Sequence, residues 1–485
     1  MTKHVFHPSI LRAYDIRGIV DETLTLNDAK AIGIAFAACL RQRGYGNHVA
    51  VGRDGRLSSP ALAAALCDGL VAGGARVSDI GCGPTPMLYY AGVTLNANAA
   101  IQVTGSHNPP THNGFKMMMN GTVFFGDDIQ NLGSISANGP ALQEGGSQSE
   151  VPIFDDYISR LIADANTGDF TVIWDCGNGA SGPATIAATQ KISGNHKVLF
   201  GDIDGTFPNH HPNPVDPETL AILRKAVADA GADLGIGFDG DGDRIGIVDA
   251  KGRQVPGDFL TAFLARDILA RHAGAPVILD VKSSDMAMAL IAEGGGDAQI
   301  WKTGHSHMKT RMAEINAPLA GEMSGHIFIK DGFYGFDDAL YVGLRVLCQM
   351  AKTGQSITDF VDGLPPQHAT PELRIDCPDD QKFGVIDRLA TEAKTRFDEE
   401  SLSLIDGVRV RNDDGWWLVR ASNTEAALVA RAEGKTPEIL DTLVGQIEDA
   451  LAGAGLAWHG SGHKTGRLEQ FGHQKPITEK STPEL

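Results

Sequence analysis

The sequence predicts an α/β protein of several domains, in which three related α/β domains precede a C-terminal α+β domain. Length is the first observation: 485 residues exceed what one hydrophobic core holds, and about 100–200 residues per domain gives three or four domains. The second is a repeated pattern, in which a short apolar run ends in a Gly- or Asp-rich loop and an Ala- and Leu-rich segment with helical spacing follows. Composition is the third, since 42% hydrophobic and 21% charged residues exclude wholesale disorder.

The strand-then-helix pattern is clearest in three places. Strand-like runs within residues 48–56, 171–179 and 275–284 each precede a segment with helical spacing. This alternation is typical of parallel sheets. Three such blocks, each of about a hundred residues, therefore indicate repeated α/β domains.

Segments rich in helix and strand breakers mark the expected domain boundaries. Gly, Ser, Gln and Pro concentrate at residues 139–150, 250–257 and 362–372. Residues 373–458 mix strand-like runs with two charged amphipathic helices, which is typical of an α+β module, and the tail beyond His459 has too few apolar residues to pack independently. The predicted divisions are residues 1–148, 149–252, 253–365 and 366–460, with a polar tail at 461–485.

Charge and cysteine content limit the expected partners and compartment. The chain has 41 Lys and Arg against 60 Asp and Glu, a net charge of −19, which argues against nucleic acid as the main partner because phosphate neutralisation needs clustered cations. The six cysteines show neither CxxC nor zinc-ligand spacing and are expected to be small buried hydrophobes in a reducing compartment. The sequence contains neither a signal-peptide-like run nor 18 consecutive apolar residues, so we expect no membrane association and a cytoplasmic location.

The segment DGDGDR presents three carboxylates from one tight loop. Asp239, Asp241 and Asp243 alternate with glycines directly after the apolar run LGIGF. Such density of negative charge is costly unless a cation neutralises it. An EF-hand would need Gly at the sixth and Glu at the twelfth loop position, where this chain has Arg244 and Ala250. Oxygen ligands beside an arginine favour Mg²⁺ held next to a phosphate, against the alternative of a solvated acidic turn.

The segment TGSHNPP offers a candidate nucleophile. An apolar strand leads into Thr104, Gly105 and Ser106, and Pro109 and Pro110 stiffen the turn that follows. The Ser106 hydroxyl can therefore project from a rigid loop, where a neighbouring base could activate it. A simple polar turn would explain the same residues.

Two further loops carry polar groups suited to a phosphosugar. In GEMSGH, an extended backbone would point Glu322 and Ser324 to the same side, toward vicinal sugar hydroxyls, with His326 beside them. In RASNT, guanidinium, hydroxyl and amide groups gather at a strand end, as a phosphate dianion requires. A ligand-free polar loop and a helix cap, respectively, remain the alternative readings.

A glycine pattern also suggests a dinucleotide site. Gly177, Gly179 and Gly182 form GxGxxG after a strand, with Asp202 about twenty residues later. Glycine, however, is 58 of the 485 residues, and a second match at Gly235 shows how easily the pattern arises. The chain has no GxxxxGK[ST] and no GxSxG, so the sequence gives no support to P-loop or α/β-hydrolase chemistry.

Taken together, TGSHNPP, DGDGDR, GEMSGH and RASNT, in this order and spacing, closely resemble the α-D-phosphohexomutase superfamily over about residues 8 to 460. The N-terminal RAYDIRG and the Met in GEMSGH look most like the bacterial phosphomannomutase/phosphoglucomutase branch, whereas phosphoglucosamine mutases typically have Gln in that loop. The resemblance implies four domains around a central cleft, with one motif loop from each: phosphoserine, metal-binding, sugar-binding and phosphate-binding.

The resemblance also assigns roles to residues. Ser106 is the expected phosphoserine, and the other expected catalytic groups are Lys116, Arg244 and His305. The implied ligands of one Mg²⁺ per active site are Ser106, Asp239, Asp241 and Asp243. The implied substrate-binding residues are Tyr14, Arg17, Lys282, Glu322, Ser324, His326, Arg420, Ser422, Asn423, Thr424 and Arg431.

The implied activity is that of an isomerase that moves phosphate between O1 and O6 of a hexose. Phosphoserine gives its phosphoryl group to the free hydroxyl, and the resulting hexose 1,6-bisphosphate turns over and returns its other phosphoryl group to the serine. Such transfer depends on positioning and charge neutralisation. The alternatives are a phosphoglucosamine mutase, a non-catalytic phosphosugar-binding protein and a nicotinamide oxidoreductase. The sequence gives no indication of oligomeric state.

Overall fold

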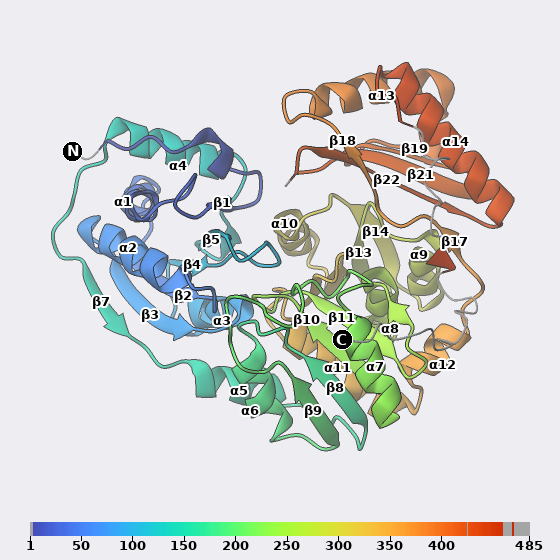
Figure 1. Cartoon of the computed structure of the whole chain (residues 1–485), viewed down its shortest axis with the longest axis horizontal. Helices are drawn as coiled ribbons and strands as arrows, with labels where there is room; N and C mark the ends of the chain where they lie inside the picture. The colour runs from blue at the N-terminus through green and yellow to red at the C-terminus, as the bar shows by residue number, and fades with distance from the viewer. Residues whose placement is uncertain (1–2, 424, 459–467, 470–485) are drawn as a thin grey trace, which may run out of the picture. The chain divides into compact units, whose positions relative to one another are not determined.

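A computed structural model describes residues 3–423, 425–458 and 468–469. It divides the chain into two compact units, Met1–Ile357 and Thr358–Leu485 (Figure 1). The first unit contains three β-sheets and the second contains one.

The first sheet is formed by the N-terminal part of the chain. Its order is β1-β5-β4-β2-β3-β7, with β6 paired to β5, and β2, β3, β4 and β7 pair in parallel while β5 runs antiparallel to β4. The strands are β1 (Ile16–Ile19), β2 (His48–Arg53), β3 (Arg76–Cys82), β4 (Ala99–Val103), β5 (His112–Met119), β6 (Thr122–Val123) and β7 (Ser147–Glu150). The helices are α1 (Leu26–Gln42), α2 (Ser59–Ala72), α3 (Thr85–Thr94) and α4 (Asp127–Asn138).

The second sheet has the order β12-β11-β10-β8-β9, and β11 runs antiparallel to β10. Its strands are β8 (Thr171–Asp175), β9 (Asn195–Leu199), β10 (Leu234–Phe238), β11 (Ile245–Asp249) and β12 (Gln254–Val255). Its helices are α5 (Phe154–Ile162), α6 (Gly182–Thr189) and α7 (Ala221–Ala230).

The third sheet has the order β14-β13-β15-β16, and β16 runs antiparallel to β15. Its strands are β13 (Pro276–Asp280), β14 (Asp297–Trp301), β15 (Leu319–Gly321) and β16 (Ile327–Ile329). Its helices are α8 (Gly257–Leu269), α9 (Asp285–Glu293), α10 (His305–Ile315) and α11 (Ala339–Thr353).

All three sheets share one topological core. In chain order, two strands pair in parallel, a third pairs in parallel with the first of them, and a fourth returns antiparallel to the third. The strand order is therefore the same in β5-β4-β2-β3, β11-β10-β8-β9 and β16-β15-β13-β14. This repetition confirms the prediction of three related α/β domains.

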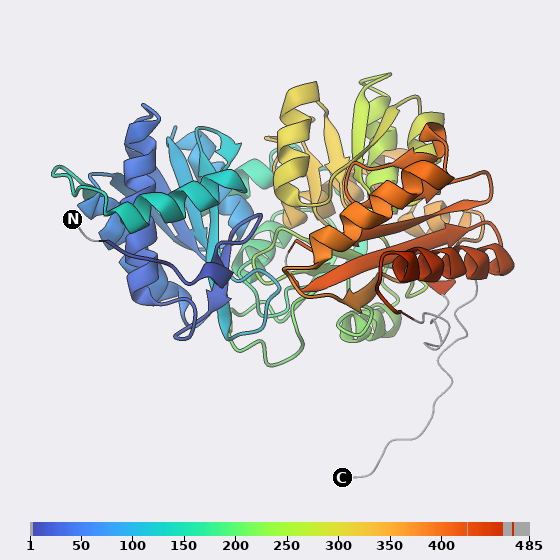
Figure 2. The same cartoon turned by 90° about the horizontal axis from the view of Figure 1, so that it is seen from above.

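The second unit is an antiparallel sheet with two long helices across it (Figure 2). The sheet order is β19-β20-β21-β22-β17-β23, with β18 paired to β22. The elements are α12 (Ile357–Asp362), β17 (His368–Ala369), β18 (Leu373–Asp376), α13 (Lys382–Arg396), β19 (Leu402–Ser403), β20 (Val408–Arg411), β21 (Gly415–Ala421), β22 (Ala427–Gly434), α14 (Pro437–Gly453) and β23 (Leu468–Glu469). Apolar residues of α13, α14, β20, β21 and β22 form its core, which confirms the predicted α+β module.

The cysteines are less uniformly buried than expected. The expectation that all six cysteines are buried is wrong for Cys348, which is half-buried, and for Cys82, which is exposed because it ends β3 where the chain leaves the sheet. Among the helices that the structure describes, none has both the length and the apolar character needed to cross a membrane. Apart from residues 468–469, the predicted polar tail lies outside the described residues.

Candidate active site

Ser106 lies in the loop that connects β4 to the antiparallel strand β5. Its backbone adopts φ +48, a conformation that is uncommon outside glycine. The Ser106 amide donates to Thr104 Oγ1 at 2.8 Å, and the residue is 1% exposed. The loop therefore holds the hydroxyl in one direction and away from bulk water.

Arg56 holds this loop through its backbone carbonyls, and the sequence analysis did not identify this residue. Its Nη2 donates to the carbonyls of Ser106 (2.8 Å) and Asn108 (2.6 Å), while its Nη1 donates to those of Pro109 (2.6 Å) and His112 (3.0 Å). A side chain at Gly105 would collide with the guanidinium, since a Cβ there would lie 2.4 Å from Arg56 Cζ. The sequence contained one indication of this role. Arg56 lies three residues beyond a buried strand, in RDGR at positions 53–56, and buried loop carbonyls need hydrogen-bond donors of this kind.

Asp54 completes this support. Its Oδ2 accepts from the Gly105 amide at 3.1 Å and lies 3.2 Å from Arg56 Nε. Both side chains are fully buried, so the pair neutralises itself away from solvent. Ser106 is thus positioned by an ion pair that does not itself need to contact a substrate.

The loop between β10 and β11 brings three carboxylates to Ser106. Asp239, Asp241 and Asp243 are each fully buried, and their oxygens lie within 4.8 Å of one another. Ser106 Oγ donates to Asp239 Oδ2 at 2.9 Å. Lys116, from β5, donates to Asp241 Oδ2 at 2.8 Å and also contacts Asp243 Oδ2. The structure therefore brings the predicted nucleophile and the predicted metal loop together.

Electrostatics show that this cluster carries excess negative charge. Burial, followed by the charges of Asp241 and Asp243, raises the pKa of Asp239 well above its ordinary value. Burial acts to lower the pKa of Lys116, but the three aspartates outweigh it and raise that pKa. One ammonium thus faces three carboxylates, and Asp241 Oδ1 and Asp243 Oδ1 have no hydrogen-bond partner among the described residues. An all-oxygen set with this charge fits Mg²⁺.

The third motif loop connects β15 to the antiparallel strand β16. The expectation that Glu322 and Ser324 lie on extended backbone is wrong, because the Gly325 amide donates to the Glu322 carbonyl at 3.0 Å and closes a turn. Ser324 Oγ still lies 3.4 Å from Glu322 Oε2, so the turn brings the two polar groups together. Glu322 Oε1 also accepts from the Gly304 amide, which anchors the carboxylate.

Tyr14 and His305 lie beside this loop. The Tyr14 hydroxyl donates to the Thr303 carbonyl at 2.6 Å. Burial, followed by the charge of Lys309, lowers the pKa of His305 well below its ordinary value, and neither of its ring nitrogens has a hydrogen-bond partner among the described residues. A neutral, buried imidazole of this kind can accept a proton or a hydrogen bond from a ligand.

Three predicted cationic residues are placed by polar neighbours. Arg17 Nε donates to Asp15 at 2.8 Å, and its Nη1 donates to Asn108 Oδ1 in the Ser106 loop at 2.6 Å. Arg244 donates through Nε to His326 Nε2 at 3.0 Å. Lys282 Nζ lies 3.8 Å from Asp280 Oδ2 and is 5% exposed.

In the second unit, Arg420 and Ala421 of the RASNT motif end β21, and Ser422 and Asn423 follow them toward β22. The Ser422 amide donates to the Ala427 carbonyl at 2.9 Å, and Ser422 Oγ accepts from the Glu425 amide at 3.2 Å. Arg420 donates to Asp406 at 3.0 Å. Asn423 is part of this turn, and Arg431 lies on β22 with its guanidinium 5.6 Å from the Trp416 ring centroid. The remaining predicted residue, Thr424, lies outside the described residues.

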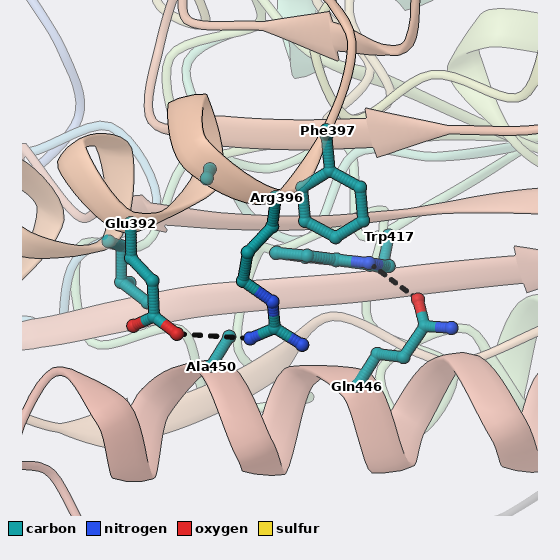
Figure 3. Close-up of a pocket in the computed structure, with 8 residues that line it drawn as sticks. Glu392, Arg396, Phe397, Trp417, Gln446 and Ala450 are labelled. Carbon is teal, nitrogen blue, oxygen red and sulfur yellow. Dashed lines mark hydrogen bonds and ion pairs between the residues drawn. The ribbon is translucent and has the colours of Figure 1, made fainter.

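A pocket in the second unit lies away from these motif residues. Figure 3 shows Arg396 and Phe397 at the end of α13 above Trp417 and α14. Arg396 pairs with Glu392 at 3.0 Å, and Trp417 Nε1 donates to Gln446 at 3.0 Å. The residues that line this pocket include none of the motif residues.

The GxGxxG segment lies at a strand-to-helix turn, between β8 and α6, as a dinucleotide site requires. The turn is used differently, however. The Ala180 amide donates to the Gly240 carbonyl at 2.9 Å, and Asn178 Nδ2 donates to the Asp202 carbonyl at 3.0 Å. These glycine-rich residues therefore support the carboxylate loop.

Family models match most of the chain. The phosphoglucomutase/phosphomannomutase alpha/beta/alpha domains I, II and III match residues 8–139, 155–252 and 256–368, and the C-terminal domain of the same family matches residues 372–450.

Whole-chain comparisons agree with these models. A phosphomannomutase/phosphoglucomutase of Pseudomonas putida is 44% identical over 427 residues, which is 88% of this chain and 91% of that protein. A phosphoglucomutase of Neisseria meningitidis is 39% identical, over 93% of this chain and 98% of that protein. A crystal structure of a phosphoglucomutase/phosphomannomutase family protein from Burkholderia thailandensis superimposes with a TM-score of 0.87 at 39% identity, over 93% of this chain and 98% of that one. The chain belongs to the phosphoglucomutase/phosphomannomutase family.

Proposed function

We propose that this protein is a phosphomannomutase/phosphoglucomutase that interconverts hexose 1-phosphates and hexose 6-phosphates through phosphorylated Ser106. The observation that carries the proposal is the contact of Ser106 Oγ with Asp239 Oδ2 at 2.9 Å, inside a buried cluster of three carboxylates and one lysine. A serine held beside a cation-binding cluster suits reversible phosphoryl transfer.

The reaction requires two transfers of opposite direction. In the first, the bond between phosphorus and Ser106 Oγ breaks, a bond forms to the free sugar hydroxyl, and that hydroxyl loses its proton. The product is a hexose 1,6-bisphosphate, which must turn over before its other phosphoryl group returns to Ser106. The net change moves one phosphate between O1 and O6, so phosphate is neither consumed nor released.

The residues that would hold magnesium are Ser106, Asp239, Asp241 and Asp243. When bound, Mg²⁺ neutralises the charge of the transferring phosphoryl group. Lys116 can donate hydrogen bonds to phosphoryl oxygens next to the same carboxylates. Together with Arg244 it supplies positive charge at the reacting end, and His305 is a candidate to take or return the hydroxyl proton.

Substrate recognition is proposed to divide between two chemistries. Glu322 and Ser324 would bind sugar hydroxyls, because the turn holds a carboxylate and a hydroxyl side by side. The RASNT turn, with Arg420, would bind the phosphate that is not being transferred. The further proposed substrate contacts are Tyr14, Arg17, Lys282, His326, Ser422, Asn423, Thr424 and Arg431.

Two properties of the cellular role belong to the same proposal. All six cysteines are free, which suits a reducing compartment, and we propose that the enzyme acts in the cytoplasm on phosphosugars. Phosphoglucosamine mutase activity is the alternative, which the names of the similar proteins do not favour.

The decisive experiment measures turnover of mannose 1-phosphate and glucose 1-phosphate with Mg²⁺ and trace glucose 1,6-bisphosphate, for the wild type and for Ser106→Ala. We expect turnover of both sugars by the wild type, its loss in the variant, and phosphate on Ser106 by mass spectrometry. If the phosphorylated wild type turns over neither sugar, the proposal fails, and activity on glucosamine 1-phosphate would establish the alternative.

A further inference from the structure

Lys382 is the first residue of α13, and it is buried. The residue is 4% exposed, although lysine is almost never fully buried unless its ammonium is paired. Its position also opposes the helix dipole, because the amino end of a helix favours acidic groups, and the first turn of α13 contains none. A lysine here costs the helix some electrostatic stability, so a compensating gain has to come from the contacts of its ammonium.

The ammonium of Lys382 contacts two groups. Nζ donates to Asp379 Oδ1 at 2.7 Å and to the backbone carbonyl of Glu425 at 2.9 Å. Asp379 is three residues earlier in the chain, and its side chain is 51% exposed, so water also solvates this carboxylate. Glu425 follows the RASNT motif, two residues before β22 begins. The bond to Glu425 is therefore the one that joins α13 to a distant part of the chain.

Glu425 is held at both of its backbone groups. Its carbonyl accepts from Lys382, and its amide donates to Ser422 Oγ at 3.2 Å. Ser422 is tied a second time, because its own amide donates to the Ala427 carbonyl at 2.9 Å. The position of the Ser422 hydroxyl thus depends on Glu425, which is fixed in turn by Lys382.

The carbonyls that follow the motif all have donors. Those of Glu425, Ala426 and Ala427 accept from Lys382 Nζ, from the Cys377 amide at 3.1 Å and from the Ser422 amide, respectively. Of these three donors, Lys382 alone uses a side chain. It is therefore the support of this backbone that a substitution can remove while the other two bonds stay in place.

We propose that Lys382 is a positioning residue, which acts through Glu425 to hold Ser422 where the RASNT residues bind the phosphate that is not being transferred. The proposal rests on the mutase function proposed above. Lys382 itself does not need to touch the phosphate, since its ammonium is buried and engaged by Asp379 and Glu425. Donors that are held in place bind an anion more tightly, because less ordering has to be paid for when the ligand arrives.

The substitution Lys382→Met removes the ammonium and keeps a long side chain in the buried position. The phosphate that is not being transferred keeps its contacts in the ground state and the transition state, so weaker positioning lowers both affinities equally. We expect KM for glucose 1-phosphate to rise about tenfold, the lower end of what one hydrogen bond from a charged donor contributes, with kcat changed less than about twofold. Damage to folding alone would instead lower the active fraction, and hence kcat, with KM unchanged. Lys382→Gln, also neutral, carries the same expectation if Lys382→Met does not fold.

Arg374 offers a matched control for charge. It pairs with the carboxylate of the same Glu425, but the two side chains are 58% and 48% exposed, so this pair contributes little. Arg374→Gln removes one positive charge beside Glu425 and leaves the Glu425 carbonyl bound to Lys382. We expect its KM to stay within about threefold of the wild-type value. An equal rise of KM in Arg374→Gln and Lys382→Met would indicate lost charge rather than lost positioning, and would overturn the proposal.

Calorimetry separates binding from catalysis. Glucose 1-phosphate is titrated into the Ser106→Ala protein, which is expected not to turn it over, with and without Lys382→Met. We expect Kd to rise about tenfold with Lys382→Met and to recover in part with Lys382→Arg, which keeps a cationic donor. An unchanged Kd, or a loss of kcat with KM unaltered, would contradict the assignment. If the wild type lacked mutase activity, the proposed function would fail, while the calorimetry would still test whether Lys382 sets the affinity for a phosphosugar.

Discussion

Replacing Arg56 with Lys should loosen the Ser106 loop without removing positive charge from its core. In the structure, one guanidinium donates to four backbone carbonyls of this loop and pairs with Asp54. A lysine ammonium is a single point with three hydrogens, so it can remain near Asp54 but cannot serve carbonyls that lie along both edges of a planar guanidinium. At least two hydrogen bonds from a charged donor are then lost.

The magnitude follows from burial. Because the Arg56 side chain is fully buried, solvent does not replace the lost bonds, and the carbonyls remain unsatisfied. Two such losses at about 1.5–3 kcal/mol each give about 3 kcal/mol or more. A left-handed conformation costs a non-glycine residue roughly 1–3 kcal/mol, which the contacts of the loop must offset. Because the lost hydrogen bonds are worth at least as much, the remaining contacts should not hold Ser106 at φ +48°, and the residue should relax.

The assay is hydrogen exchange of the amides in residues 104–112, read by mass spectrometry alongside kcat. An opening energy lower by about 3 kcal/mol raises exchange by more than about a hundredfold. Arg53→Lys is the matched control, because Arg53 ends the strand that precedes Arg56 but is 29% exposed and lies 3.6 Å from Asp79, a pairing worth about 0–1 kcal/mol. If exchange and kcat in Arg56→Lys match those of Arg53→Lys, the reasoning about the loop is refuted.

Three further outcomes are expected. Asp241→Asn should weaken Mg²⁺ binding at least about tenfold, measured by calorimetry, since a charged ligand is lost from a buried site; unchanged affinity would place the ion elsewhere. Burial acts to lower the pKa of His210, but the hydrogen bond to Asp175 and the negative charge of Asp175 outweigh burial and raise that pKa. The pair should therefore stabilise the fold below about pH 6.5, and this contribution should be lost as the pH rises through the raised pKa of His210. The difference in Tm between wild type and His210→Gln should therefore shrink from pH 6 to pH 8.5, and a constant difference would contradict the assignment. Gly304→Ala should cost about 1–3 kcal/mol and raise KM, because residue 304 has φ +120 and a Cβ would lie 2.5 Å from the Tyr14 ring; thermal melts and kinetics of the variant would detect both effects.

The sequence was a good guide to the repeated α/β pattern but not to strand direction. The strands β5, β11 and β16 run antiparallel to their neighbours. Their apolar residues look like those of a buried parallel strand, because burial on both faces removes the alternation that would distinguish them. The direction depends on a short loop that returns the chain, and nothing in the composition of that loop requires it.

The candidate site was predictable where its chemistry lies in one short segment. Ser106 and the three aspartates are close in the structure, and each group was visible as a dense motif. Arg56 was missed because its role depends on partners from other elements, and a single Arg beside a strand has no distinctive pattern. The turn at Glu322 was misjudged because the sequence does not reveal the hydrogen bond from the Gly325 amide that closes it.

The shared topology explains why the three loops of the first unit suit one site. In each sheet the motif follows the third strand and precedes the antiparallel return strand. Arg244 and His326 occupy the same place in two of these sheets, each directly before the return strand, and they pair as an antiparallel bridge. The Ile245 amide adds a hydrogen bond to the Gly325 carbonyl at 3.0 Å, so the carboxylate loop and the Glu322 loop are joined through their backbones. Because these bonds would have to break for the two loops to separate, any rearrangement that the proposed turnover of a bisphosphate needs should leave the Arg244–His326 bridge intact.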